Sequence, residues 1–147
     1  MSKVVIDTNI FVSALMNAHG APRQIIRLSL LGELSPLMGN ALLGEYEDVI
    51  GRERIQAKCV LDAGERQELL NAFLSACEWV SVYFLWRPNL RDEADNHLVE
   101  LALAGGANTI ITANKRDLNN GDLSFPDINI LNAGEYLDKR RRSSWEL

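Results

Sequence analysis

The feature that most constrains this chain is the alternation of short, continuous apolar runs with segments of helical periodicity. Residues 4–6 form a β-branched run that Asp7 closes, the pattern of a strand buried on both faces of a sheet. Further strand candidates are residues 37–38, 80–84, 109–112 and 128–131. Strands that alternate with helices in this way predict an α/β fold with a mainly parallel sheet.

Helical periodicity fills the segments between these runs. The expected helices cover residues 10–16, 22–31, 40–50, 62–77, 95–105 and a closing segment after Asn132. A chain of 147 residues has about the length of one domain, and neither an internal repeat nor a long linker divides it. We therefore predict a single domain, with a core over about 1–138 and a basic tail over 139–147, built on an open sheet with helices on both faces.

Charge and cysteine content exclude several classes of protein. The formal net charge of −5 leaves no bulk positive field, so nucleic-acid contacts must rely on local patches or bound cations. Cys59 and Cys77 lack the paired spacing of a zinc or dithiol site and are interpreted as free thiols in a reducing compartment. Because no apolar run reaches the length of a membrane span, we expect a cytoplasmic protein without membrane contact.

Acidic residues stand at positions where they could serve either as helix caps or as chemical groups. Asp7 follows the first strand, and Asp92 and Asp95 stand at the entry to a later helix. Glu45 and Glu47 fall on opposite rims of the apolar stripe of helix 40–50, so helical geometry does not choose between them. All of these acids therefore keep a structural interpretation beside the functional one.

The joint arrangement of these acids favours chemistry. Ligands of parallel α/β sheets bind beyond the carboxyl ends of the strands, where Asp7 and Asn114 are expected. Several carboxylates in one place repel one another unless a cation neutralises them. Oxygen ligands with few histidines suit Mg²⁺ or Mn²⁺, which commonly complete their coordination with substrate phosphate. Phosphodiester hydrolysis is therefore the leading prediction.

The motifs also resemble those of a known family. VVIDTNIFVSAL, LLGEYEDVI and DEADNHLVELALAGGANTIITANKRDL are similar, in this order and over nearly the whole chain, to the signatures of PIN-domain ribonucleases. The resemblance is strongest to bacterial VapC-type proteins, the toxin components of toxin–antitoxin pairs. It implies a single PIN-like domain that hydrolyses single-stranded or structured RNA with Mg²⁺ or Mn²⁺.

Carried over by position, the resemblance implies metal ligands at Asp7, Glu45 and Asp95, with Asp92 as an auxiliary candidate. Asp7, Glu45 and Asp95, together with Asn114, would form the catalytic set. Asn114 stands where many relatives have an aspartate, and its amide can coordinate or donate a hydrogen bond but supplies no charge. This departure bears on whether a second metal ion is held.

The remaining implied roles concern orientation, substrate and partners. Asn9 and Thr112 would orient ligands or the attacking water, although turn capping is their alternative role. Lys115 and Arg116 would contact RNA phosphates. The resemblance also implies a homodimer or higher oligomer and a cognate antitoxin protein.

Three other functions were weighed. A phospho-receiver domain needs two acids after its first strand, which this chain lacks. A haloacid-dehalogenase-type phosphatase needs an acid two residues after its nucleophile, where this chain has Asn9. Both functions are therefore disfavoured. The stronger alternative is a catalytically weak PIN fold that binds RNA or protein without turnover, which the uncharged Asn114 suggests.

Overall fold

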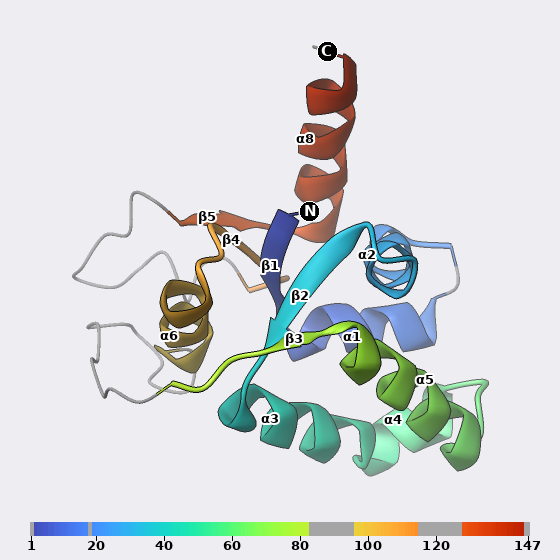
Figure 1. The fold of residues 1–147 in the computed structure, drawn as a ribbon. Helices are drawn as coiled ribbons and strands as arrows, with labels where there is room; N and C mark the ends of the chain where they lie inside the picture. Colours follow the sequence, from blue (N-terminus) through green and yellow to red (C-terminus); the bar gives the residue numbers. More distant parts are fainter. Residues whose placement is uncertain (1, 18, 83–95, 115–127, 146–147) are drawn as a thin grey trace.

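The strands form one parallel sheet. The computed structural model describes residues 2–17, 19–82, 96–114 and 128–145, and the structural statements below concern these residues. The sheet has the order β3-β2-β1-β4-β5, and each pair of neighbouring strands is parallel (Figure 1). The strands are β1 (Ser2–Ile6), β2 (Leu34–Met38), β3 (Glu78–Trp79), β4 (Thr109–Ile111) and β5 (Asn129–Leu131).

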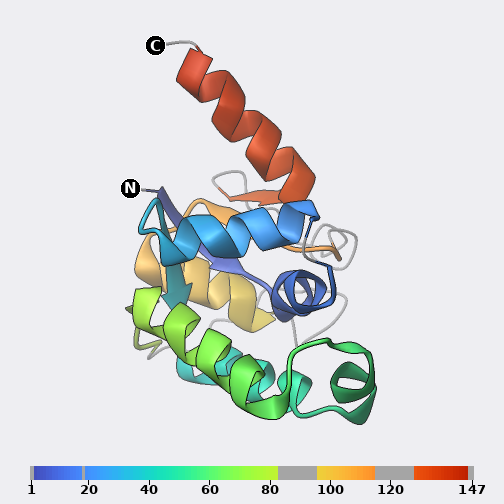
Figure 2. The same cartoon turned by 90° about the vertical axis from the view of Figure 1, so that its right-hand side faces the viewer.

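Helices cover both faces of the sheet, as the sequence predicts. The described helices are α1 (Thr8–Met16), α2 (Ala21–Leu30), α3 (Asn40–Ile50), α4 (Glu53–Lys58), α5 (Ala63–Ala76), α6 (Asn96–Gly105) and α8 (Ala133–Trp145). Helix α6 packs on one face, whereas α1, α2 and α5 lie on the other (Figures 1 and 2). Helix α8 is continuous through the basic run at 139–142 and extends away from the body of the molecule.

Among the helices that the structure describes, none combines the length and the apolar character that crossing a membrane requires.

Local chemistry explains where the helices begin and end. Asp62 and Glu65 form a capping box at the start of α5, and Asn132 and Glu135 exchange the same pair of hydrogen bonds at the start of α8. Helix α6 ends at Gly105, and the next residue, Gly106, has a φ of +76°, the left-handed conformation that glycine adopts without strain. These signals are local, which is why the sequence predicts these helix boundaries well.

The core has an aromatic centre between α1, α3 and α5. Phe11, Tyr46 and Phe73 are fully buried, and their ring centroids lie 5.4 to 5.6 Å apart. The phenol of Tyr46 also donates a hydrogen bond to the backbone carbonyl of Ile6, with an oxygen–oxygen distance of 2.7 Å. This contact ties α3 to the end of β1, where the first predicted acid stands.

Two elements differ from the sequence prediction. The strand expected at 80–84 instead covers Glu78–Trp79, and residues 83–84 lie outside the described part of the chain. Strand β2 extends through Pro36, which the sequence pattern indicates as a break. Strand β3 pairs with Leu37 and Met38 and does not reach Pro36, whereas β1 pairs with Pro36 through Val4.

Candidate functional site

The order of the strands creates a crevice at the end of β1. From β1 the chain moves outward to β2 and β3 on one side, and it returns to β4 and β5 on the other side. The crossovers therefore reverse direction between β1 and β4, and such a switch point is where parallel α/β sheets bind ligands. The backbone N–H of Asp7 donates to the carbonyl of Ile111 at 3.0 Å, so these two strand ends lie side by side.

Asp7 occupies this switch point and is a buried residue, only 7% exposed. Its Oδ1 accepts a hydrogen bond of 2.8 Å from the backbone N–H of Thr8, which makes Asp7 the N-cap of α1. Its Oδ2 accepts hydrogen bonds from Thr112 Oγ1 at 2.7 Å and Asn9 Nδ2 at 3.2 Å. Asp7 therefore caps α1 with one oxygen, while the side chains of Thr112 and Asn9 hold the other.

Thr112 and Asn9 join the ends of β1 and β4 across more than one hundred residues of sequence. Thr112 Oγ1 accepts a hydrogen bond from the backbone N–H of Asn114 at 3.0 Å while it donates to Asp7. Asn9 Oδ1 accepts from the backbone N–H of Ala113 at 3.1 Å. The network holds the Asp7 carboxylate in one orientation, and its Thr–Ala–Asn segment places Asn114 at the same edge of the sheet.

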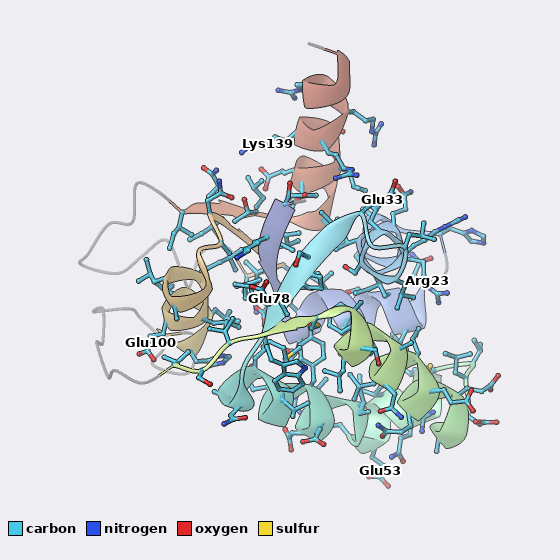
Figure 3. The ribbon with its side chains drawn as sticks, in the orientation of Figure 1. Arg23, Glu33, Glu53, Glu78, Glu100 and Lys139 are labelled. Carbon is cyan, nitrogen blue, oxygen red and sulfur yellow. The ribbon has the colours of Figure 1, made fainter. Side chains whose placement is uncertain are left out.

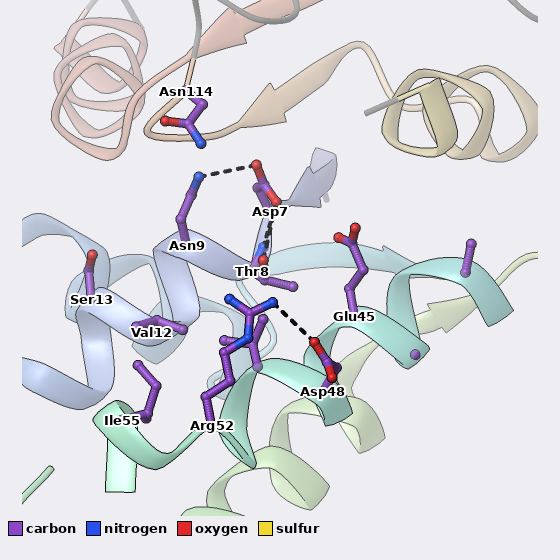
Figure 4. A pocket seen from close by; sticks show the side chains of 13 residues that line it. Asp7, Thr8, Asn9, Val12, Ser13, Glu45, Asp48, Arg52, Ile55 and Asn114 are labelled. Atoms are coloured by element: carbon purple, nitrogen blue, oxygen red, sulfur yellow. Dashed lines mark hydrogen bonds and ion pairs between the residues drawn. The ribbon is translucent and has the colours of Figure 1, made fainter. Parts of the chain in front are cut away.

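The structure distinguishes between the two glutamates on α3. Glu45 lines a cleft with Asp7, whereas Glu47 lines a separate hollow against residues of α4 and α5. Figure 4 shows the carboxylate of Glu45 extending from α3 toward the sheet edge that carries Asp7. Glu45 Oε1 also lies 3.2 Å from His97 Nε2 of α6, whose side chain is 17% exposed.

The cleft has a volume of about 820 Å³ and is open to solvent. It is lined by Asp7, Thr8, Asn9, Val12, Ser13, Ala41, Gly44, Glu45, Asp48, Val49, Arg52, Ile55 and Asn114 (Figure 4). Three of these residues are acidic, and Arg52 is the one cation among them. Arg52 reaches into the cleft from the beginning of α4 and pairs with Asp48 at 3.0 Å.

The surrounding charges act on Tyr46 beneath the cleft. Burial raises the pKa of its phenol well above 10, and electrostatic interactions with Cys77, Asp7 and Glu45 raise this pKa further, in that order of size. The phenol therefore stays protonated and keeps its hydrogen bond to Ile6 at ordinary pH. Tyr46 links the helix that carries Glu45 to the strand that ends at Asp7.

Four predicted site residues lie outside the described part of the chain: Asp92, Asp95, Lys115 and Arg116. The other five, Asp7, Asn9, Glu45, Thr112 and Asn114, lie at the cleft or hydrogen-bond to residues that line it. The described residues contain no group of three or more histidine, cysteine, aspartate or glutamate side chains placed to hold a metal ion. Asp7, Glu45 and Asn114 nevertheless supply the oxygen donors that Mg²⁺ and Mn²⁺ prefer.

Sequence reasoning missed several contributors to the site. Tyr46 is part of the apolar stripe of α3, so the pattern indicates only a core residue. Arg52 precedes α4, a helix of six residues that the sequence does not reveal. By contrast, the basic C-terminal run lies away from the cleft: its Lys139 is on α8, at the opposite end of the molecule from α4 (Figure 3).

Comparison with known proteins shows what this chain is similar to. The sequence model of a family described as PIN domain matches residues 3–116. The chain is 34% identical over 116 residues to "Uncharacterized protein MJ1680" of Methanocaldococcus jannaschii, and the match covers 77% of this chain and 71% of that protein. The fold of this chain is similar to that of a chain in the crystal structure of VapBC2 from Rickettsia felis bound to a DNA fragment from their promoter. That match has a TM-score of 0.55 and 17% identity, and it covers 88% of this chain and 98% of the other.

Proposed function

Since this chain belongs to the PIN domain family, we propose that it is a metal-dependent ribonuclease whose hydrolytic centre includes Asp7, Glu45 and Asp95. PIN domains are generally nucleases, and they usually use divalent metal ions. The observation that carries the proposal is the buried Asp7, whose carboxylate is oriented by the side chains of Thr112 and Asn9 and by the backbone N–H of Thr8, and which lines the same cleft as Glu45.

The residues of the described site fit a divalent cation. Asp7 and Glu45 approach the cleft from a strand end and a helix, and Asn114 adds an uncharged oxygen donor from β4. When Mg²⁺ or Mn²⁺ is bound in such a site, it supplies an activated water and neutralises charge on the phosphodiester. Replacing a fourth carboxylate by the amide of Asn114 lowers the negative charge that the ion must balance.

The hydrogen bonds around Asp7 prepare it for this role. Thr112 donates its hydroxyl proton to Oδ2, and Thr8 donates its N–H to Oδ1. Because each donor is anchored to the sheet or to α1, the carboxylate is oriented before any ligand arrives. Asn9 and Thr112 are thus positioning residues in this proposal.

One contact and one feature of the sequence support including Asp95, which lies outside the described residues. In the sequence it directly precedes α6, and His97 of that helix lies 3.2 Å from Glu45. The beginning of α6 is therefore near the carboxylate of α3.

Lys115 and Arg116 follow Asn114 in sequence, and we propose that they contact RNA phosphates near the cleft.

We further propose a toxin role with a protein antitoxin as partner. The support is the fold similarity to a chain in the crystal structure of VapBC2 from Rickettsia felis. A homodimer or higher oligomer belongs to the same proposal.

The test is cleavage of an unstructured, end-labelled RNA by the purified chain. We expect cleavage with Mg²⁺ or Mn²⁺, none after chelation, and a loss of at least about a hundredfold in Asp7→Asn. Asp62→Asn is the matched control, since Asp62 also caps a helix but lies outside the cleft. Cleavage without metal, or full activity of Asp7→Asn, contradicts the mechanism. Metal-dependent RNA binding without any turnover would favour the binding-module alternative.

A further inference from the structure

The two carboxylates that line the cleft as proposed metal ligands are held very differently. Asp7 accepts hydrogen bonds from three donors, two on α1 and one at the end of β4. Glu45 reaches the cleft on a longer side chain, which is 37% exposed. Within the described part of the chain, the polar group in reach of its carboxylate is the imidazole of His97, whose Nε2 lies 3.2 Å from Oε1.

His97 stands in the first turn of α6, on the opposite side of this contact from α3. Its side chain is only 17% exposed, and both of its ring nitrogens are shielded from solvent. Neither nitrogen has an aligned hydrogen bond to any residue that the structure describes. A buried polar group without a hydrogen bond is costly, and this cost favours completing the bond between His97 and Glu45.

The chemistry of the two groups fixes the direction of that bond. An ionised carboxylate oxygen can only accept, so Nε2 of His97 is the atom that carries the hydrogen. The two atoms are already within bonding distance, and a rotation of the carboxylate brings them into line. Hydrogen bonds of catalytic groups are often poorly aligned before a ligand arrives and tighten in the complex. Donation to Oε1 leaves the other oxygen of Glu45 available to a cation.

His97 does not belong to the described lining of the cleft, whereas Glu45 does. The imidazole is therefore a neighbour of the carboxylate and not of a ligand bound in the cleft. Any effect of His97 on such a ligand has to pass through Glu45.

Resting on the proposed metal-dependent function, we infer that His97 is a positioning residue whose Nε2–H fixes the Glu45 carboxylate for the divalent cation. A glutamate side chain has many rotamers, and restricting them before the ion arrives lowers the entropy that is lost on binding. Groups that hold a metal ligand without touching the metal typically contribute about ten- to a hundredfold in affinity. His97 thereby gives Glu45 the fixed orientation that Asp7 obtains from its three donors.

The experiment measures Mn²⁺ affinity without RNA, from the electron paramagnetic resonance signal of free Mn²⁺ during a titration of the purified chain. His97→Leu keeps an apolar side chain of similar size and removes the donor, so we expect its Kd for Mn²⁺ to rise about tenfold or more. His97→Gln places an amide N–H close to the position of Nε2 and should stay within about threefold of the wild type. Equal losses in the two variants would mean that His97 only packs, and would overturn the inference.

His19 provides the matched control. It is an exposed histidine between α1 and α2 and lies outside the lining of the cleft. His19→Leu makes the same chemical change as His97→Leu, and we expect it to leave the Kd for Mn²⁺ within about twofold of the wild type. Should His97→Leu fail to fold, His97→Asn takes its place, because its shorter amide does not reach Oε1 and should show the same loss.

A double variant tests whether His97 acts through Glu45. In a Glu45→Ala background the acceptor is gone, so adding His97→Leu should raise the Kd for Mn²⁺ by less than about twofold further. A loss as large as in the wild-type background would mean that the imidazole contacts the ion itself, and would overturn the positioning role.

The outcomes separate this inference from the proposed function. Metal-dependent RNA cleavage by the wild-type chain, together with unchanged Mn²⁺ affinity in His97→Leu, overturns the positioning role and leaves the ribonuclease proposal standing. Absence of Mn²⁺ binding by the wild-type chain overturns both.

Discussion

Replacing Tyr46 by phenylalanine isolates a single hydrogen bond beneath the catalytic cleft. The substitution keeps the ring that packs against Phe11 and Phe73 and removes only the hydroxyl that donates to the Ile6 carbonyl at 2.7 Å. Both partners are buried, so the carbonyl loses its donor where water does not easily replace it. Removing one partner of such a bond costs about 1–3 kcal/mol.

This loss should be visible in equilibrium unfolding. For a chain of this size, 1 kcal/mol corresponds to a decrease in Tm of about 2–4 °C, so we expect Tyr46→Phe to melt about 3–9 °C below the wild type. The matched control is Tyr136→Phe, because Tyr136 is 7% exposed and its hydroxyl has no hydrogen bond within the described part of the chain. Urea unfolding at neutral pH gives both free energies.

The raised pKa of Tyr46 adds a dependence on pH. In the unfolded chain the phenol ionises near pH 10, whereas in the folded chain it ionises well above that value. The contribution of Tyr46 to stability is therefore complete below pH 10 and falls as pH rises toward the folded-state pKa. The difference in unfolding free energy between wild type and Tyr46→Phe should be constant from pH 6 to 9 and decrease above pH 10.

Equal stability of Tyr46→Phe and wild type would refute the reasoning, and so would a loss no larger than that of Tyr136→Phe. In either case the contact between α3 and β1 would depend on ring packing alone.

Further predictions concern packing and titration. Gly105→Ala should lower the free energy of unfolding by about 1–3 kcal/mol, because the added Cβ would overlap Leu37 Cδ1 where α6 crosses β2. Gly44→Ala, where a Cβ meets no atom within 4 Å, should instead stabilise α3 by about 0.5–1 kcal/mol, and urea unfolding of both variants compares them. Burial raises the pKa of the Cys77 thiol from 9.0 to about 12, so its contribution to stability is present below pH 9 and is lost as pH rises toward 12. Unfolding free energies at pH 8 and pH 11 should therefore differ less in Cys77→Ser than in the wild type, and an equal difference would contradict this assignment.

The site could be predicted in part because some of its signals are local. Asp7 directly follows a strand, and Thr112 to Asn114 directly follow another, so the rule that parallel strands bind ligands at their carboxyl ends brings them together. The side of α3 that faces the cleft is not a local property. Glu45 and Glu47 flank the same apolar stripe, and only the packing of α3 against β1 through Tyr46 directs Glu45 into the cleft.

The sequence by itself determined the α/β class, most of the helix boundaries and the acids that could act together, because hydrophobic period and capping chemistry act over a few residues. Only the tertiary structure decided that Thr112 donates to Asp7, that Glu45 faces the cleft and that Arg52 stands at its rim. These contacts join residues about 40 to 105 positions apart, or depend on a helix as short as α4. Such distances follow from the order in which parallel strands assemble, and no local pattern of residues encodes that order.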